Sequence, residues 1–158
     1  MRLKSKYGFT LVELLIVIAI FALIANFTMV SLNNARRKSR DAKRMSDIAQ
    51  LRNALHLYSV NGNGFPAGDG LPLGSSNYLI LNGNGWGINT TAPVFMFNVP
   101  RDPQMVNDTA SACTDSSSSP CDYGYYQNGN DFVIYFYLEG DVEQMPAGLH
   151  AATKDSVL

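Results

Sequence analysis

The stretch Lys6–Phe21, KYGFTLVELLIVIAIF, decides how the rest of the chain is interpreted. It is the most apolar part of the sequence, yet it contains an acidic residue, Glu13, five positions after Gly8. A carboxylate at the depth of a bilayer costs roughly 2–3 kcal/mol even on the insertion scales that give the lowest penalties. An acid in this place therefore calls for a partner or a function.

Charge is distributed unevenly along the 158 residues, although the formal net charge is only −1. Ten of the twelve Lys and Arg residues lie in residues 1–52, whereas ten of the thirteen acidic residues follow residue 52. The length is that of one small domain with an additional segment. Because the part after residue 60 is acidic, we expect no nucleic acid to bind this head directly.

Residues 9–27 are long enough and apolar enough to cross a bilayer as a helix. Three basic residues before this segment predict that residues 1–8 face the cytoplasm, although seven basic residues after it favour the opposite orientation. A secretory signal peptide is one alternative, but the small residues of a cleavage site are missing after the apolar run. A plain membrane anchor is another, but it explains neither Gly8 nor Glu13.

The absence of Gly and Pro from Phe9 to Val60 predicts one long helix, which the stretch NGNGFP at 61–66 ends. Residues 9–27 are apolar all round, whereas residues 28–60 form an amphipathic half. From residue 45 onward, apolar residues recur every three or four positions. This stripe consists of Met45, Ile48, Leu51, Leu55 and Tyr58.

Polar residues between the stripe positions, Arg44 and Asp47 among them, are expected to lie away from the apolar face. The basic run NNARRKSRDAKR at 33–44 has three interpretations. It forms a solvated surface, contacts lipid head groups before assembly, or contacts the acidic heads of neighbouring subunits.

The stretch KYGFTLVELLIVIAI resembles the prepilin leader of type IV pilins and type II secretion major pseudopilins. The resemblance implies that residues 1–8 are a leader peptide, that a prepilin peptidase cuts between Gly8 and Phe9, and that the new amine of Phe9 is methylated. It also implies that Glu13 pairs with the terminal amine of a neighbouring subunit, because a buried carboxylate is tolerable when it is paired. The alternative is that Glu13 extends its carboxylate toward the lipid head groups.

Residues 61–158 are expected to form a globular head with a small antiparallel sheet. The clearest signal is a hairpin, in which YGYY and DFVIYFYLE flank QNGN. The stretch VFMFNV at 94–99 is another candidate strand, and residues 61–93 are expected to be loop with one short element at most. The predicted fold class is therefore α+β and pilin-like, with a long N-terminal helix packed on the sheet. One face of the second hairpin strand is expected to pack on the helix stripe, and it consists of Phe132, Ile134, Phe136 and Leu138.

The two cysteines, Cys113 and Cys121, lie in a polar loop and allow only one pairing. No histidine or second cysteine pair is near them in the sequence, so they make a poor zinc site. If this part of the chain is exported, a disulfide between them is the expected outcome.

The resemblance also implies calcium in the loop that follows the hairpin, where Glu139, Asp141 and Glu143 are candidate oxygen ligands. These residues do not follow an EF-hand pattern, and a solvated loop is the other interpretation. No other cofactor is expected. Because the sequence lacks a nucleophile elbow, a phosphate-binding loop and an HExxH motif, we do not expect an enzyme.

The resemblance implies a structural subunit of a type IV pilus-like filament. The chain would be held in membrane lipid as a single-pass precursor and cut by prepilin peptidase. An inner-membrane assembly platform would then build it into a homo-oligomeric helical filament at the cell surface or outside it. One alternative is a pseudopilin of a type II secretion or DNA-uptake machine. An alternative from another class is a solitary membrane-anchored surface binding module.

Overall fold

The structure is a computed structural model that describes residues 8–105 and 111–157. The chain forms two compact units, residues 1–36 and residues 37–158. One helix, α1 (Leu11–Tyr58), runs through both units and continues into a π-helical turn, Ser59–Asn63. In the described residues the strands are β1 (Asp69–Pro72), β2 (Ile80–Asn82), β3 (Gly85–Gly87), β4 (Val94–Met96), β5 (Gly124–Asn128), β6 (Asp131–Leu138) and β7 (Gly148–Thr153).

The first unit contains the apolar part of α1. All residues from 8 to 36 are exposed, and the large apolar side chains from Phe9 to Leu32 are 39–82% exposed. In the part of the chain that the structure describes, α1 is the one helix whose length and composition would allow it to cross a membrane. Two polar side chains of this segment are satisfied within the helix, since Asn26 and Thr28 donate to the carbonyl oxygens of Ala22 and Ile24.

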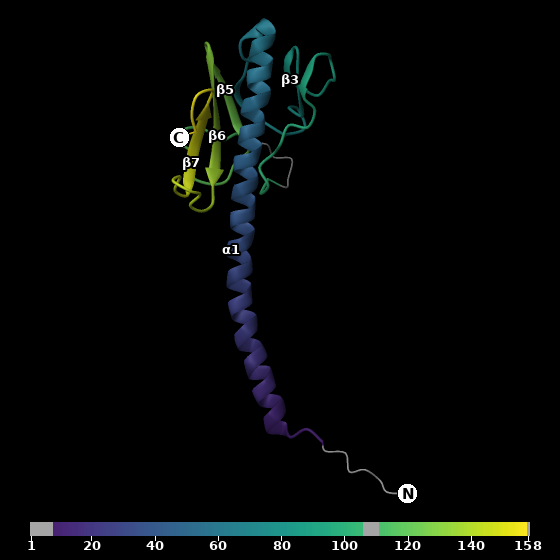
Figure 1. The fold of residues 1–158 in the computed structure, drawn as a ribbon, viewed down its shortest axis with the longest axis vertical. Coiled ribbons are helices and arrows are strands. Elements are labelled where there is room, and N and C mark those ends of the chain that lie inside the picture. The colour runs from purple at the N-terminus through teal and green to yellow at the C-terminus, as the bar shows by residue number, and fades with distance from the viewer. Residues whose placement is uncertain (1–7, 106–110, 158) are drawn as a thin grey trace, which may run out of the picture. The chain divides into compact units, whose positions relative to one another are not determined.

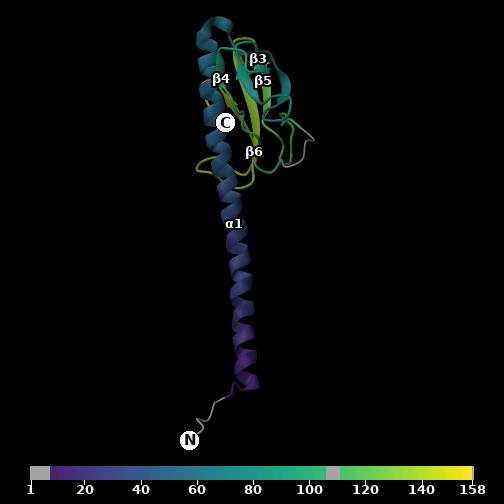
Figure 2. The same cartoon turned by 90° about the vertical axis from the view of Figure 1, so that its right-hand side faces the viewer.

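The second unit contains two antiparallel sheets beside the carboxy-terminal part of α1 (Figures 1 and 2). One sheet has the strand order β1-β5-β6-β7, and the smaller one has the order β3-β2-β4. The predicted hairpin is confirmed: β5 pairs with β6, and Asn128 lies opposite Asp131 across the turn. Gly129 has a φ of 60° in this turn, a conformation that glycine adopts without a steric penalty.

Strand β6 carries the centre of the core. Its side chains alternate between buried and half-buried, and the four predicted inward residues are fully buried. They share one hydrophobic cluster with Ile48, Leu51 and Leu55 of α1, as the sequence pattern predicts. The predicted α+β class is therefore confirmed, with an amphipathic helix packed on an antiparallel sheet.

The prediction for residues 61–93 was wrong, because this part contains β1, β2 and β3. Each of these strands has only three or four residues, so no alternating pattern is long enough to predict it. Two of them depend on distant partners, since β1 pairs with β5 and β2 pairs with β4. The candidate strand at 94–99 is present but shorter, as β4.

Candidate processing and assembly site

The predicted cleavage position lies in exposed chain. Gly8 and Phe9 precede the helix, and Phe9 is 82% exposed. A Cβ atom built at Gly8 would meet no atom within 4 Å, and Gly8 does not have a positive φ. The fold therefore does not require glycine at this position. The rest of the predicted leader, residues 1–7, lies outside the described residues.

Glu13 caps the start of its own helix. Thr10 and Glu13 form a capping box, in which the backbone N–H of Glu13 donates to the Thr10 hydroxyl at 3.2 Å. In return, the Thr10 backbone N–H and hydroxyl donate to Glu13 Oε2 at 3.3 and 3.1 Å. The S/T-x-x-E signature of this box is present in the sequence at TLVE, although the partners expected for Glu13 were only a neighbouring subunit's amine or the lipid head groups.

The capping box gives the Glu13 carboxylate a partner within the single chain. A negative charge in the first turn also interacts favourably with the helix dipole. Glu13 nevertheless remains exposed, so a further cation can approach it. Local capping and intermolecular pairing are therefore compatible uses of this acid, and a substitution must separate them.

The second unit contains a buried cluster of charges that the sequence analysis did not predict. Arg44 was expected to lie away from the apolar face, but it is fully buried. Its Nε donates to Asp102 Oδ2 at 2.6 Å, and its Nη1 donates to Asp41 Oδ1 at 2.6 Å and to Glu139 Oε1 at 2.7 Å. The prediction failed because two of the three acceptors, Asp102 and Glu139, lie 58 and 95 residues away in the sequence. Burial opposes the charge of Arg44, but the hydrogen bonds to Asp102 and Glu139 raise its pKa above the ordinary value.

Two more arginines of α1 reach the residue that follows β6. Arg40 donates from Nε to Glu139 Oε1 at 2.6 Å and from Nη2 to Oε2 at 2.5 Å, and Arg37 donates to the Glu139 carbonyl oxygen. Part of the basic run at 33–44 therefore binds the head of its own chain. This use differs from all three interpretations that the sequence left open.

Asp47 was also expected to lie away from the core, but its exposed fraction is only 5%. The hydroxyl of Tyr123 donates to Asp47 Oδ2 at 3.0 Å, and Lys43 Nζ lies 3.9 Å from the same oxygen. Burial raises the pKa of Asp47, while the Tyr123 hydrogen bond opposes the increase. Tyr123, which precedes β5 and lies 76 residues away in the sequence, thus compensates the desolvation of Asp47. The position of Asp47 on the helix did not predict this partner.

Glu139 gives the head a predictable sensitivity to acid. The Arg40 hydrogen bonds, and to a smaller extent those of Arg44, lower its pKa from 4.5 to about 2, although burial acts in the opposite direction. A carboxyl group whose pKa is lower in the folded state stabilises that state above its unfolded pKa, and this contribution is lost as the pH falls toward the folded pKa. We expect Glu139→Gln to lower the free energy of unfolding at pH 7 by about 3 kcal/mol, and the difference from wild type to shrink between about pH 4.5 and 2.

Denaturant unfolding of the full chain in detergent micelles at several pH values measures this effect. Glu143→Gln changes an exposed acid of the same loop and serves as the matched control. A stability difference between Glu139→Gln and wild type that stayed the same from pH 7 to pH 2 would show that the ionised carboxylate is not its source.

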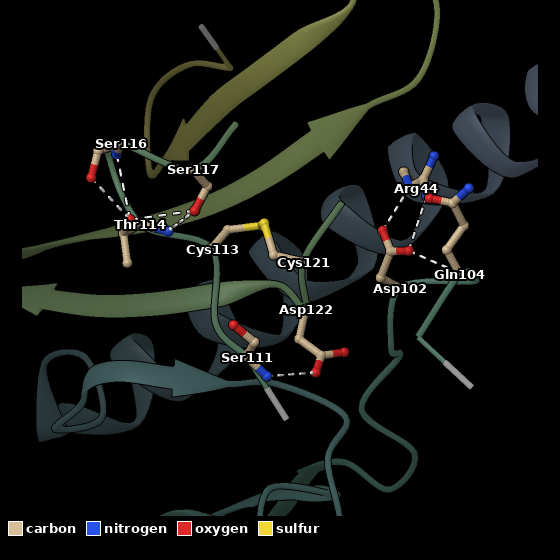
Figure 3. Close-up of a disulfide and its surroundings, with 10 residues drawn as sticks. All are labelled: Arg44, Asp102, Gln104, Ser111, Cys113, Thr114, Ser116, Ser117, Cys121 and Asp122. Atoms are coloured by element: carbon tan, nitrogen blue, oxygen red, sulfur yellow. Dashed lines mark hydrogen bonds and ion pairs between the residues drawn. A yellow bond between two sulfur atoms is a disulfide. The ribbon is translucent and has the colours of Figure 1, made fainter. Parts of the chain in front are cut away.

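The predicted disulfide is present between Cys113 and Cys121, with a Cα–Cα distance of 5.1 Å (Figure 3). Both cysteines are buried, and the backbone N–H of Cys113 donates to the Asp122 carbonyl oxygen at 2.8 Å. Gly124 lies against this segment, because a Cβ atom there would come within 1.9 Å of the Cys113 carbonyl oxygen. Figure 3 also shows Arg44 reaching from the helix toward Asp102 and Gln104.

Two of the three calcium candidates are already engaged in hydrogen bonds, and the third, Glu143, is exposed. Both carboxylate oxygens of Glu139 pair with arginines, and Asp141 Oδ1 accepts a hydrogen bond from the Ala147 backbone N–H at 2.9 Å. Among residues 8–105 and 111–157, no group of three or more His, Cys, Asp or Glu side chains could hold a metal ion. The described residues therefore do not fit the calcium site that the resemblance implied.

Comparison with known proteins gives a match to one family motif and to several relatives. Residues 3–25 match the prokaryotic N-terminal methylation motif. The chain is similar to the type II secretion system core protein G of Aeromonas hydrophila, with 35% identity over 66 residues, 42% of this chain and 46% of that protein. The corresponding protein of Vibrio cholerae is 31% identical over 68 residues, 43% of this chain and 47% of the relative. That of Escherichia coli K12 is 36% identical over 67 residues, 42% of this chain and 46% of the relative.

The chain thus spans about half the length of the curated relatives it matches. No solved structure matches it. These relatives are core proteins of a secretion system. They favour the secretion alternative over the pilus that was the main expectation. The chain therefore carries the N-terminal methylation motif of prepilin-like proteins, and the relatives that it resembles are the core G proteins of type II secretion.

Proposed function

We propose that this chain is the repeating subunit of a pseudopilus in a type II secretion system. It is inserted in the inner membrane through residues 9–27, is cut after Gly8 by prepilin peptidase, and assembles with copies of itself into a helical filament in the periplasm. Residues 28–60 and the head, residues 61–158, then follow the membrane segment. The observation that carries this proposal is the methylation motif at 3–25 joined to an apolar helix that the fold leaves exposed.

The exposed apolar surface supports assembly on energetic grounds. Burial of one Leu, Ile or Phe side chain contributes roughly 1.5–3 kcal/mol, and residues 9–32 carry many such side chains that are exposed. Lipid covers this surface in the precursor. The same surface on neighbouring copies covers it in a filament, so the helix can move from one apolar environment to the other.

The role of Gly8 leads to a test that does not depend on folding. We expect Gly8→Val to leave the precursor uncut, because the fold has open space at Gly8 and glycine there is needed only by the peptidase. Intact mass spectrometry of the protein from its own envelope measures the outcome. Gly87→Val is the matched control, since a Cβ atom at Gly87 also meets nothing within 4 Å and this glycine is far from the cut. Normal processing of Gly8→Val would remove the argument for cleavage at this position.

The same measurement on the wild-type protein tests the proposal as a whole. We expect a chain that begins at Phe9, heavier by one methyl group and lighter by the two hydrogens lost in the disulfide. A chain that still begins at Met1 in a host with active prepilin peptidase would indicate a plain membrane anchor, and the filament proposal would then be withdrawn.

A pilus for adhesion or twitching is the second candidate, because the methylation motif is common to pilins and pseudopilins. The similarity to core protein G favours secretion. Disruption of the gene in its own host separates the two. Loss of secreted proteins from the medium with unchanged surface motility supports a pseudopilus, and the reverse result supports a pilus.

A further inference from the structure

We propose that arginines of α1 hold the loop after β6 in place of a divalent cation, so that the head folds and keeps this loop ordered without calcium. The inference goes beyond the proposed function, since neither processing nor assembly through the apolar helix depends on how the head fixes this loop. It is carried by the contacts of Arg40, Arg44, Asp41, Asp102 and Glu139.

The first part of the argument concerns the carboxylate of Glu139. Both of its oxygens accept charge-assisted hydrogen bonds from guanidinium groups, at 2.5–2.7 Å from the nitrogens of Arg40 and Arg44. The Glu139 side chain is only 10% exposed. A metal ion bound to these oxygens would have to displace two positive groups or lie beside them, and like charges repel strongly where water is excluded.

The second part concerns the backbone of the loop. The N–H groups of Glu139 and Gly140 each donate to a carboxylate oxygen of Asp41, at 3.0 Å in both cases. Asp41 is buried on α1, and its Oδ1 also accepts the hydrogen bond from Arg44. The start of the loop is therefore fixed to the helix by its main chain as well as by its side chain.

The third part concerns Arg44, which is the cation at the centre of this cluster. Three carboxylates contact one fully buried guanidinium: Asp41 from the same helix, Asp102 from the segment after β4, and Glu139, which follows β6. Convergent carboxylates around a buried positive charge are the arrangement by which an ion would join these segments. Here the positive charge is covalently attached to the chain and cannot dissociate.

The remaining candidate ligands, Asp141 and the exposed Glu143, do not complete a metal site. Calcium takes six to eight oxygen ligands. Asp141 is exposed, and one of its oxygens accepts the hydrogen bond from Ala147 that closes the loop. The loop is closed further by two backbone hydrogen bonds between Val142 and Met145. Its order is thus provided by hydrogen bonds within the described residues.

The test measures thermal unfolding and amide exchange of the full chain in detergent micelles, with EGTA or with about 10 mM calcium, which is about tenfold above the dissociation constants of even the weakest extracellular sites. We expect the Tm of the wild-type protein to be the same in both solutions. A specifically bound ion at saturation would instead raise the Tm by several degrees. We also expect the amides of Glu139 and Gly140 to be protected from exchange in EGTA.

Two substitutions each remove one of the arginines that hold the loop, and a third serves as a control. Arg44→Gln should lower the Tm by about 10 °C or more, because it leaves buried carboxylates without their partner. Arg40→Gln changes a half-buried residue, so it should leave the head folded and accelerate exchange at Glu139 and Gly140 by about tenfold in either solution. Arg36→Gln, a change at an exposed arginine of the same run, should alter neither quantity.

A reversible increase of several degrees in the wild-type Tm with calcium would overturn the proposal. So would loop amides that exchange freely in EGTA and become protected in calcium. If Arg44→Gln fails to fold, Arg40→Gln decides the matter, and unchanged exchange in that variant would also count against the proposal.

Discussion

We expect filament assembly to be lost or disordered in both Glu13→Ala and Glu13→Gln. The second variant is the more informative, because it separates the charge of Glu13 from its capping hydrogen bonds. Glutamine retains the oxygen that accepts the capping hydrogen bonds from Thr10, but it carries no charge. Alanine removes both the cap and the charge. If the negative charge of Glu13 pairs with the amine of a neighbouring subunit, both variants lose this pair.

The expected size of the assembly defect follows from the two roles of Glu13, as a helix cap and as one partner of an ion pair. Loss of a helix cap costs about 1 kcal/mol, which a helix held by lipid or by neighbouring chains can tolerate. Removal of one partner from a buried ion pair costs roughly 3–5 kcal/mol, and a filament repeats that cost at every subunit. Assembly should therefore respond to the charge much more than to the cap.

Thr10→Val provides the matched control. It removes the hydroxyl of the capping box but keeps the charge of Glu13, so we expect filaments to form. Sheared-fraction yield and electron microscopy measure assembly, while intact mass confirms that all the variants are cut after Gly8. Normal filaments from Glu13→Gln together with defective filaments from Thr10→Val would show that Glu13 acts only as a helix cap.

Leu51→Ala should destabilise the head strongly, by about 2–5 kcal/mol in the free energy of unfolding. Leu51 is fully buried, and it belongs to the same cluster as Ile134 and Phe136 of the central strand. Removal of its side chain leaves a cavity between the helix and the sheet. This cavity cannot collapse, because the residues on both sides are closely packed.

Leu57→Ala is the matched control for this prediction, because it makes the same change on the same helix at a side chain that is 61% exposed. We expect it to change the free energy of unfolding by less than about 0.5 kcal/mol. Denaturant unfolding of the full chain in micelles, followed by the near-ultraviolet signal of Trp86, measures both variants. Equal losses from the two would contradict the assignment of the buried helix face.

Much of the fold is predictable because its signals are local. The apolar run from Phe9 and the period of the helix stripe each occupy one continuous stretch of sequence. The alternation through Phe132, Ile134 and Phe136 does the same for the central strand, and the structure confirms it. The capping box at Thr10 and Glu13 was equally local, and its T-x-x-E signature could have revealed it before the structure did.

By itself, the sequence determined the long helix, the hairpin on which its stripe packs, and the motif that precedes it, since each depends on residues within a few positions of one another. Only the tertiary structure decided the burial of Arg44 and Asp47, because their partners, such as Asp102 and Tyr123, lie far away in the chain. It also decided the three short strands between residues 69 and 87, which are stabilised by pairing. A charged residue on an amphipathic helix is stable in the core only when distant groups compensate its desolvation, and no period along the helix carries that information.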